Sequence, residues 1–120
     1  MSRPPSPPAP LSLTPEELAD RLQTGESLQL VDVREAQELA LAQLPYPVEH
    51  LPLSRSSDWM GGVDTRLRRD LPVVVVCHAG VRSWQFACWL MEAHGYQEVW
   101  NLEGGIDAWS VRVDPSIPRY

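Results

Sequence analysis

One cysteine in this sequence stands where a nucleophile would be placed. Cys77 follows four consecutive valines and precedes a short loop that contains Gly80 and ends at Arg82. A run of four β-branched residues is too short for a helix and predicts a strand that is buried on both faces of a sheet. A helical pattern follows from about Arg82 to His94. We therefore expect Cys77 at the junction of a strand, a loop and a helix.

This position favours the thiolate of Cys77, which is the nucleophilic form of the side chain. Open α/β sheets bind ligands at the carboxyl edge of their strands, where loop N–H groups and the positive end of a helix dipole stabilise anions. Arg82 adds a fixed positive charge at the end of the loop. The alternative is that Cys77 is a small apolar residue at the end of a core strand, as free cysteines often are. The glycine and the arginine in the loop favour the nucleophile.

Composition and charge limit the classes of partner and cofactor. The 120 residues are enough for one domain with a single core. The net charge of −6 argues against nucleic acid or an anionic membrane as a partner. All ten basic residues are arginine, so an anionic substrate must be held by arginine or by backbone amides. No apolar run is long enough to span a membrane, and we expect a cytoplasmic protein in which a solvent-facing cysteine is reactive.

The other titratable residues give no metal site and no disulfide. Two cysteines and three scattered histidines lack the spacing of zinc ligands. Cys88 lies about halfway along the helix that Cys77 precedes, so a bond between the two thiols would distort that helix. We interpret Cys88 as a packing residue and expect no metal.

Helical and strand patterns alternate along the chain around the cysteine loop. This alternation predicts a three-layer α/β/α domain with a mainly parallel sheet. We divide the chain into a disordered proline-rich arm (1–10), the domain (11–113) and a C-terminal tail (114–120). The expected elements besides the central strand and its helix are a capped helix from Thr14 to Gly25, a strand over Leu28–Val33, a short helix over Ala36–Ala42, an edge strand over Val48–Leu53, a helix over Val63–Asp70, a strand over Gln97–Leu102 and a helical turn over Ile106–Val111.

Three stretches of the chain resemble the rhodanese (sulfurtransferase) domain family. Cys77-x-x-Gly80-x-Arg82-Ser83 resembles the active-site loop of the family. Leu30–Glu35 resembles the family's Asp-Val-Arg segment, and Gly104–Trp109 resembles its Gly-Gly-x-x-Ala-Trp segment. The three occur in the family's order, and the match spans about Leu11 to Arg112. The resemblance implies the rhodanese-like fold with a five-stranded sheet. It fails at 43–54, where the family's Gly-His-Ile-x-Gly-Ala pattern is missing, so no contact there can be carried over.

The resemblance implies sulfur transfer through a persulfide on Cys77, with no metal and no organic cofactor. A small anionic donor, thiosulfate or a persulfide, gives its outer sulfur, and cyanide, a thiol or an acceptor protein takes it. Asp32 and Arg34 are expected to brace the loops around the site. Arg82 is expected to orient the donor and to pair with a carboxylate such as Glu103. The residues expected to cradle the sulfur are those of the loop: His78, Ala79, Gly80, Val81, Arg82 and Ser83.

Two alternatives remain open. Phosphatases on this fold have one more residue between the cysteine and the arginine, which makes room for a tetrahedral oxyanion. From Cys77 to Arg82 there are six positions, the length that the resemblance associates with sulfur transfer rather than with phosphatase or arsenate reductase chemistry. The second alternative is a non-enzymatic binding module or persulfide carrier; members used for binding alone commonly lack the cysteine, which is present here.

Overall fold

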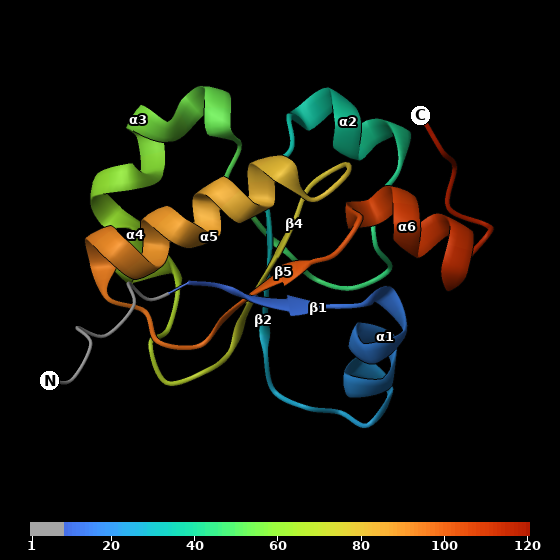
Figure 1. The fold of residues 1–120 in the computed structure, drawn as a ribbon. Coiled ribbons are helices and arrows are strands. Elements are labelled where there is room, and N and C mark those ends of the chain that lie inside the picture. The colour runs from blue at the N-terminus through green and yellow to red at the C-terminus, as the bar shows by residue number, and fades with distance from the viewer. Residues whose placement is uncertain (1–8) are drawn as a thin grey trace, which may run out of the picture.

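Five strands form one sheet in which every pairing is parallel, in the order β1-β5-β4-β2-β3. A computed structural model describes residues 9–120 of the chain (Figure 1). The strands are β1 (Leu11–Leu13), β2 (Gln29–Asp32), β3 (Glu49–His50), β4 (Val73–Val76) and β5 (Val99–Leu102). The helices are α1 (Pro15–Gln23), α2 (Ala36–Leu41), α3 (Ser56–Trp59), α4 (Val63–Arg66), α5 (Val81–His94) and α6 (Gly105–Arg112), with 3-10 turns η1 (Leu53–Arg55) and η2 (Met60–Gly62).

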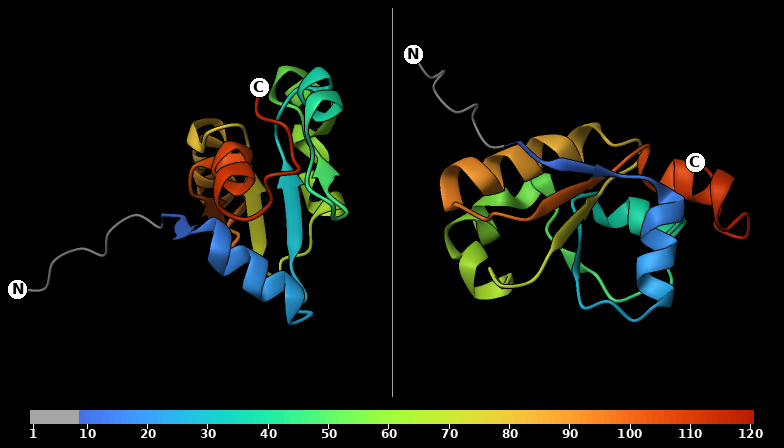
Figure 2. Two further views of the ribbon diagram at one scale, coloured as in Figure 1. Left: turned by 90° about the vertical axis from the view of Figure 1, so that its right-hand side faces the viewer. Right: turned by 60° about the horizontal axis from the view of Figure 1, so that its bottom comes forward.

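The valines of β4 supply both hydrophobic cores. Successive side chains of a strand point to opposite faces of the sheet, so Val73 and Val75 enter one core and Val74 and Val76 the other. All four valines are fully buried. The first core lies under α3, α4 and α5, and the second under α1 and α6, on the other side of the sheet (Figures 1 and 2). The prediction of a three-layer α/β domain with a central valine strand is confirmed.

Local sequence signals place the start of α1 and the end of α5 as predicted. Thr14 and Glu17 form a capping box at the start of α1, with Pro15 in the first turn. Helix α5 ends at Gly95, whose φ of 71° lies in the left-handed region that glycine adopts without strain. Helix α5 begins at Val81, inside the loop that follows Cys77. Ser83 therefore lies in the first turn of the helix, at a fixed distance from Cys77.

Several elements differ from the sequence-based expectations. Strand β1 was not predicted; its three residues pair with Trp100–Leu102 of β5 and bury only Leu13, too little for a recognisable alternation. Helix α4 ends at Arg66 rather than at Asp70, and the expected edge strand is reduced to the two residues of β3. Most of the expected disordered arm lies outside the described residues, and Pro10, which is described, is buried.

Residues 114–120 were expected to form a tail but fold back against the domain. Ile117 is buried in the core under α6, and its carbonyl accepts a hydrogen bond from the Ser110 hydroxyl. Arg119 pairs with Asp107 of α6 at 2.8 Å. These contacts carry the end of the chain back to α2, where it lies in Figure 1. Within residues 9–120, no helix is both long and apolar enough to cross a membrane.

Candidate active site

Cys77 lies directly after β4, at the carboxyl edge of the sheet and beneath the loop that leads into α5. Its side chain accepts a hydrogen bond from the Gly80 N–H, with 3.0 Å between N and Sγ. The Ser83 hydroxyl lies 3.2 Å from the same sulfur. Cys77 is only 1% exposed, so its thiol does not face bulk solvent. The sulfur therefore sits at the base of the loop, with one backbone donor and one hydroxyl directed at it.

The outer surface of the loop is open to solvent. Ala79 is exposed, and Val81, the first residue of α5, is 67% exposed. Gly80 takes a φ of 100°, which turns the chain sharply from the strand into the helix and directs its N–H back to Cys77. Ala79 and Val81 thus form the solvent side of the loop, and the Cys77 thiol lies on its inner side.

Helix α6 fixes the first part of the loop through its backbone. The N–H groups of Ile106 and Asp107 donate to the carbonyl oxygens of Cys77 and His78, at 2.9 and 3.1 Å. This approach depends on Gly105, because a Cβ there would lie 2.4 Å from both of those oxygens. The Gly-Gly segment singled out in the sequence thus lies against the cysteine loop.

Arg82 pairs with Glu38, not with Glu103 as expected. Its Nη1 and Nη2 atoms donate to the two carboxylate oxygens of Glu38, each at 2.8 Å. The Glu103 side chain is exposed and makes no hydrogen bond or ion pair within residues 9–120. Hydrogen bonding from Arg82 lowers the pKa of Glu38 to about 2, although burial of the carboxylate opposes the shift. Sequence spacing could not reveal this partner, because Glu38 is 44 residues away from Arg82 on α2.

Asp32 and Arg34 form a buried ion pair next to this contact. The Asp32 carboxylate accepts from Arg34 Nη2 at 2.8 Å and from Nε at 3.1 and 3.2 Å, and neither side chain is more than 2% exposed. Arg34 Nη1 donates to the Glu38 carbonyl at 3.3 Å. The Asp32–Arg34 pair is thus joined through Glu38 to Arg82, which is the route by which the predicted bracing would act.

Tyr120 completes this group and was missed because its segment was interpreted as a tail. Its hydroxyl accepts from Arg34 Nη1 at 3.0 Å and donates to Glu38 Oε1 at 3.0 Å. Its ring lies against the imidazole of His78, with 4.4 Å between the ring centroids. The end of the chain therefore contacts both the loop and the carboxylate that holds Arg82.

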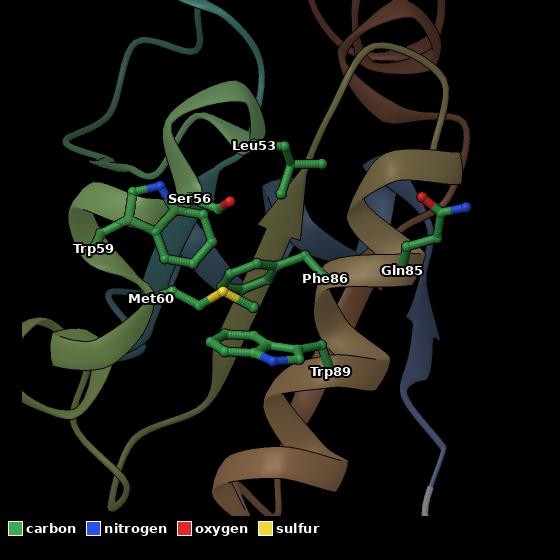
Figure 3. Close-up of a pocket in the computed structure, with 7 residues that line it drawn as sticks. All are labelled: Leu53, Ser56, Trp59, Met60, Gln85, Phe86 and Trp89. Atoms are coloured by element: carbon green, nitrogen blue, oxygen red, sulfur yellow. The ribbon is translucent and has the colours of Figure 1, made fainter.

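An apolar pocket of about 220 Å³ lies apart from the loop, between α3 and α5 (Figure 3). Trp59, Phe86 and Trp89 point toward one another there, with ring centroids 5.6 to 5.9 Å apart. None of the predicted site residues lines this pocket. In the part of the chain that the structure describes, no three His, Cys, Asp or Glu side chains are grouped so that they could hold a metal ion. The cysteine loop is therefore the candidate site.

Comparison with known proteins matches residues 14–112 to the family described as rhodanese-like domain. The chain is 39% identical over 108 residues to the Arabidopsis thaliana "Rhodanese-like/PpiC domain-containing protein 12, chloroplastic", covering 88% of this chain but only 36% of that protein. It is 35% identical over 99 residues to an Allochromatium vinosum protein named "Sulfurtransferase", covering 79% of this chain and 83% of that one. A crystal structure of a rhodanese-like domain protein from Staphylococcus aureus superposes with a TM-score of 0.72 at 29% identity, over 92% of this chain and 98% of that one.

Substituting Gly105 should disturb the loop as well as the backbone of α6. We expect Gly105→Ala to lower the free energy of unfolding by about 2 kcal/mol or more, because it adds a clash to the strain of a positive φ. Gly25→Ala is the matched control, since Gly25 also has a positive φ (77°) but open space around its Cβ position. The control should cost about 1 kcal/mol. Urea unfolding measures both, and equal losses would contradict the close approach of α6 to the loop.

The pair between Arg82 and Glu38 should appear in the acid dependence of stability. A carboxylate whose pKa is lowered on folding stabilises the protein above its unfolded pKa and loses that contribution as the pH falls through its folded pKa. For Glu38 this window runs from about pH 4.5 down to about pH 2. We expect Glu38→Gln to be less stable than wild type at pH 7 and to lose less stability across the window.

Urea unfolding at several pH values measures this difference. The exposed Glu92→Gln variant on α5 is the control, because Glu92 makes no ion pair in the described structure. If Glu38→Gln and wild type lose equal stability between pH 4.5 and 2, the pair does not contribute in solution.

Proposed function

Because the chain belongs to the rhodanese-like domain family, we propose that it is a sulfurtransferase in which Cys77 carries the transferred sulfur. The relative from Allochromatium vinosum that bears the name sulfurtransferase supports this at the level of the family. The observation that carries the proposal is the Gly80 N–H donated to Cys77 Sγ at 3.0 Å, inside a six-position loop at the start of α5. A backbone donor and a helix N-terminus directed at one sulfur stabilise negative charge on it.

In the first half-reaction, the Cys77 thiol loses its proton to solvent and the thiolate attacks the outer sulfur of thiosulfate. The new bond joins Cys77 Sγ to that sulfur, while the donor's S–S bond breaks and sulfite leaves with its electron pair. The product is a persulfide whose terminal sulfur carries the negative charge. Loop amides supply the donors for this charge, in the manner of an oxyanion hole.

In the second half-reaction, an acceptor attacks the terminal sulfur of the persulfide. Cyanide leaves as thiocyanate, or a thiolate leaves as a new persulfide, and the electron pair of the broken S–S bond returns to Cys77 as thiolate. No external oxidant or reductant enters either half-reaction. Cys77 is itself the carrier, and the proposal requires neither a metal nor an organic cofactor.

Arg82 contributes only part of the binding of the anionic sulfur donor. Two of the five N–H donors of its guanidinium are used by Glu38, and the pair as a whole has no net charge. The remaining N–H groups are free to orient an anionic donor, but the neutralised pair attracts it weakly. We propose that the loop amides hold the sulfur and that Arg82, fixed by Glu38, sets the direction of approach.

Replacing each cysteine in turn tests which one takes up the sulfur. We expect Cys77→Ser to abolish persulfide formation from thiosulfate, whereas Cys88→Ser retains most of it, since Cys88 lies on the side of α5. Intact mass spectrometry after thiosulfate treatment should show one added sulfur atom in Cys88→Ser and none in Cys77→Ser. Cyanide should then remove the added sulfur. Equal uptake, or equal loss, in the two variants would overturn the assignment.

Turnover separates an enzyme from a carrier. Repeated production of thiocyanate from thiosulfate and cyanide supports an enzyme, whereas one added sulfur without turnover supports a carrier that serves a protein partner. Wild type should not hydrolyse an activated aryl phosphate under the same conditions. Hydrolysis without any uptake of sulfur would favour the phosphatase alternative.

A further inference from the structure

One buried amide connects both hydrogen-bond partners of the proposed nucleophile. Asn101 lies on β5, where it is paired with Val75 of β4, and it is 7% exposed. Its Oδ1 accepts from the Ser83 hydroxyl at 2.5 Å, and its Nδ2 donates to the Gly80 carbonyl at 3.1 Å. Gly80 and Ser83 are the residues that contact Cys77 Sγ. Neither the cysteine loop nor the other two sequence motifs contains Asn101.

The contacts of Asn101 fix the orientation of its amide. The Gly80 carbonyl is an acceptor only, so it must face the NH₂ group. If the amide were turned over, two carbonyl oxygens would face each other, and the Ser83 hydroxyl would lose its acceptor. Asn101 Oδ1 is therefore directed at Ser83, and Asn101 Nδ2 at the peptide of Gly80.

This orientation decides where the single Ser83 hydroxyl proton lies. When Ser83 donates to Asn101, its oxygen faces Cys77 with a lone pair and can only accept the S–H of a thiol. A thiolate would instead require the hydroxyl to turn toward the sulfur, and Asn101 Oδ1 would then lose its donor. Asn101 and an ionised Cys77 thus compete for the same proton.

The second contact of Asn101 acts on the other partner of Cys77. Backbone N–H groups of α6 hold the loop at Cys77 and His78, but they do not reach Gly80. At Gly80, where the chain takes a positive φ, the Asn101 amide holds the carbonyl group from the side of β5 and so restricts the rotation of the residue that carries the N–H. Fixing this residue keeps its N–H directed at Cys77 Sγ.

We propose that Asn101 is a positioning residue that acts on Cys77 through Ser83 and Gly80. Asn101 keeps the Gly80 N–H directed at Cys77 Sγ. It also accepts the hydrogen bond of the Ser83 hydroxyl until negative charge develops on that sulfur. The inference rests on the proposed role of Cys77 and adds to it a residue on a neighbouring strand. If Asn101 had a purely structural role and only satisfied buried polar groups, the effect of replacing it on the reactivity of Cys77 would be the same with and without the Ser83 hydroxyl.

The test is a double-mutant cycle on the pH dependence of Cys77 alkylation by iodoacetamide. All variants carry Cys88→Ser, and intact mass spectrometry follows the reaction. In the Ser83→Ala background, Asn101→Ala should raise the midpoint pH of alkylation, because only the anchor of Gly80 is lost. When Ser83 is present, Asn101→Ala should raise the midpoint pH by about half a pH unit less. The Ser83 hydroxyl, no longer bonded to Asn101, can then donate to the Cys77 thiolate. Equal shifts in the two backgrounds would overturn the proposal.

Asn101→Asp provides a second variant of the same size, in case Asn101→Ala does not fold. The added negative charge raises the midpoint in both backgrounds and cancels in their difference. A carboxylate holds the Ser83 proton more firmly than an amide does, so the rise should here be larger with Ser83 than without it. A difference of zero would again overturn the proposal.

Gln29→Ala is the matched control for stability. Gln29 is also a strand amide that clamps a loop, through hydrogen bonds with Arg68 and Leu71, but it does so at the opposite edge of the sheet. Its loss should lower the urea midpoint and leave the alkylation profile unchanged. Alkylation needs no sulfur donor. A protein that takes no sulfur from thiosulfate but shows the predicted coupling would contradict the proposed function and support this inference.

Discussion

The close contact between α6 and the cysteine loop is the constraint on which the site depends. Two backbone N–H groups at the start of α6 bind the carbonyl oxygens of Cys77 and His78, and this is possible only because Gly105 has no side chain. The contact joins the end of β5 to the end of β4. With the strand pairing between them, it leaves Cys77 little freedom of position. The geometry of the sulfur is thus a property of the sheet and of α6 as much as of the loop.

A chain of polar contacts stiffens the opposite side of the loop. Asp32 holds Arg34, Arg34 contacts Glu38 and Tyr120, and Glu38 holds Arg82. Within the Asp32–Arg34 pair, burial raises the desolvation cost of both charges, and the multiple hydrogen bonds offset that cost. Removing one member of such a pair leaves a buried charge without a partner. The main effect of the pair is therefore to favour one arrangement of α2 over the loop. Its net contribution to the free energy of unfolding is small by comparison.

The sequence was sufficient for features with a local cause. Four valines followed by Cys77 predicted the buried central strand, and Thr14 with Glu17 predicted the start of α1, because strand burial and helix capping depend on neighbouring residues. The Gly104–Trp109 motif was found, but not its contact with Cys77. Glu38, Asn101 and Tyr120 were missed because their contacts cross 44, 18 to 21 and 82 residues of sequence, respectively. No periodic pattern records such contacts, which exist only once the parallel strands and α2 are packed together.

The return of residues 114–120 to the site has a topological consequence for longer chains. Leu11, where β1 begins, lies at the amino edge of the sheet, whereas Tyr120 lies at the carboxyl edge beside His78 (Figure 1). A module joined after Tyr120 would emerge next to the exposed surface of the loop, within reach of whatever binds there. One joined before Leu11 would emerge on the far side of the sheet. Leu11 and Tyr120 are thus unequal as points of fusion, because a partner linked directly after Tyr120 begins beside the site and one linked directly before Leu11 begins at the opposite edge of the sheet.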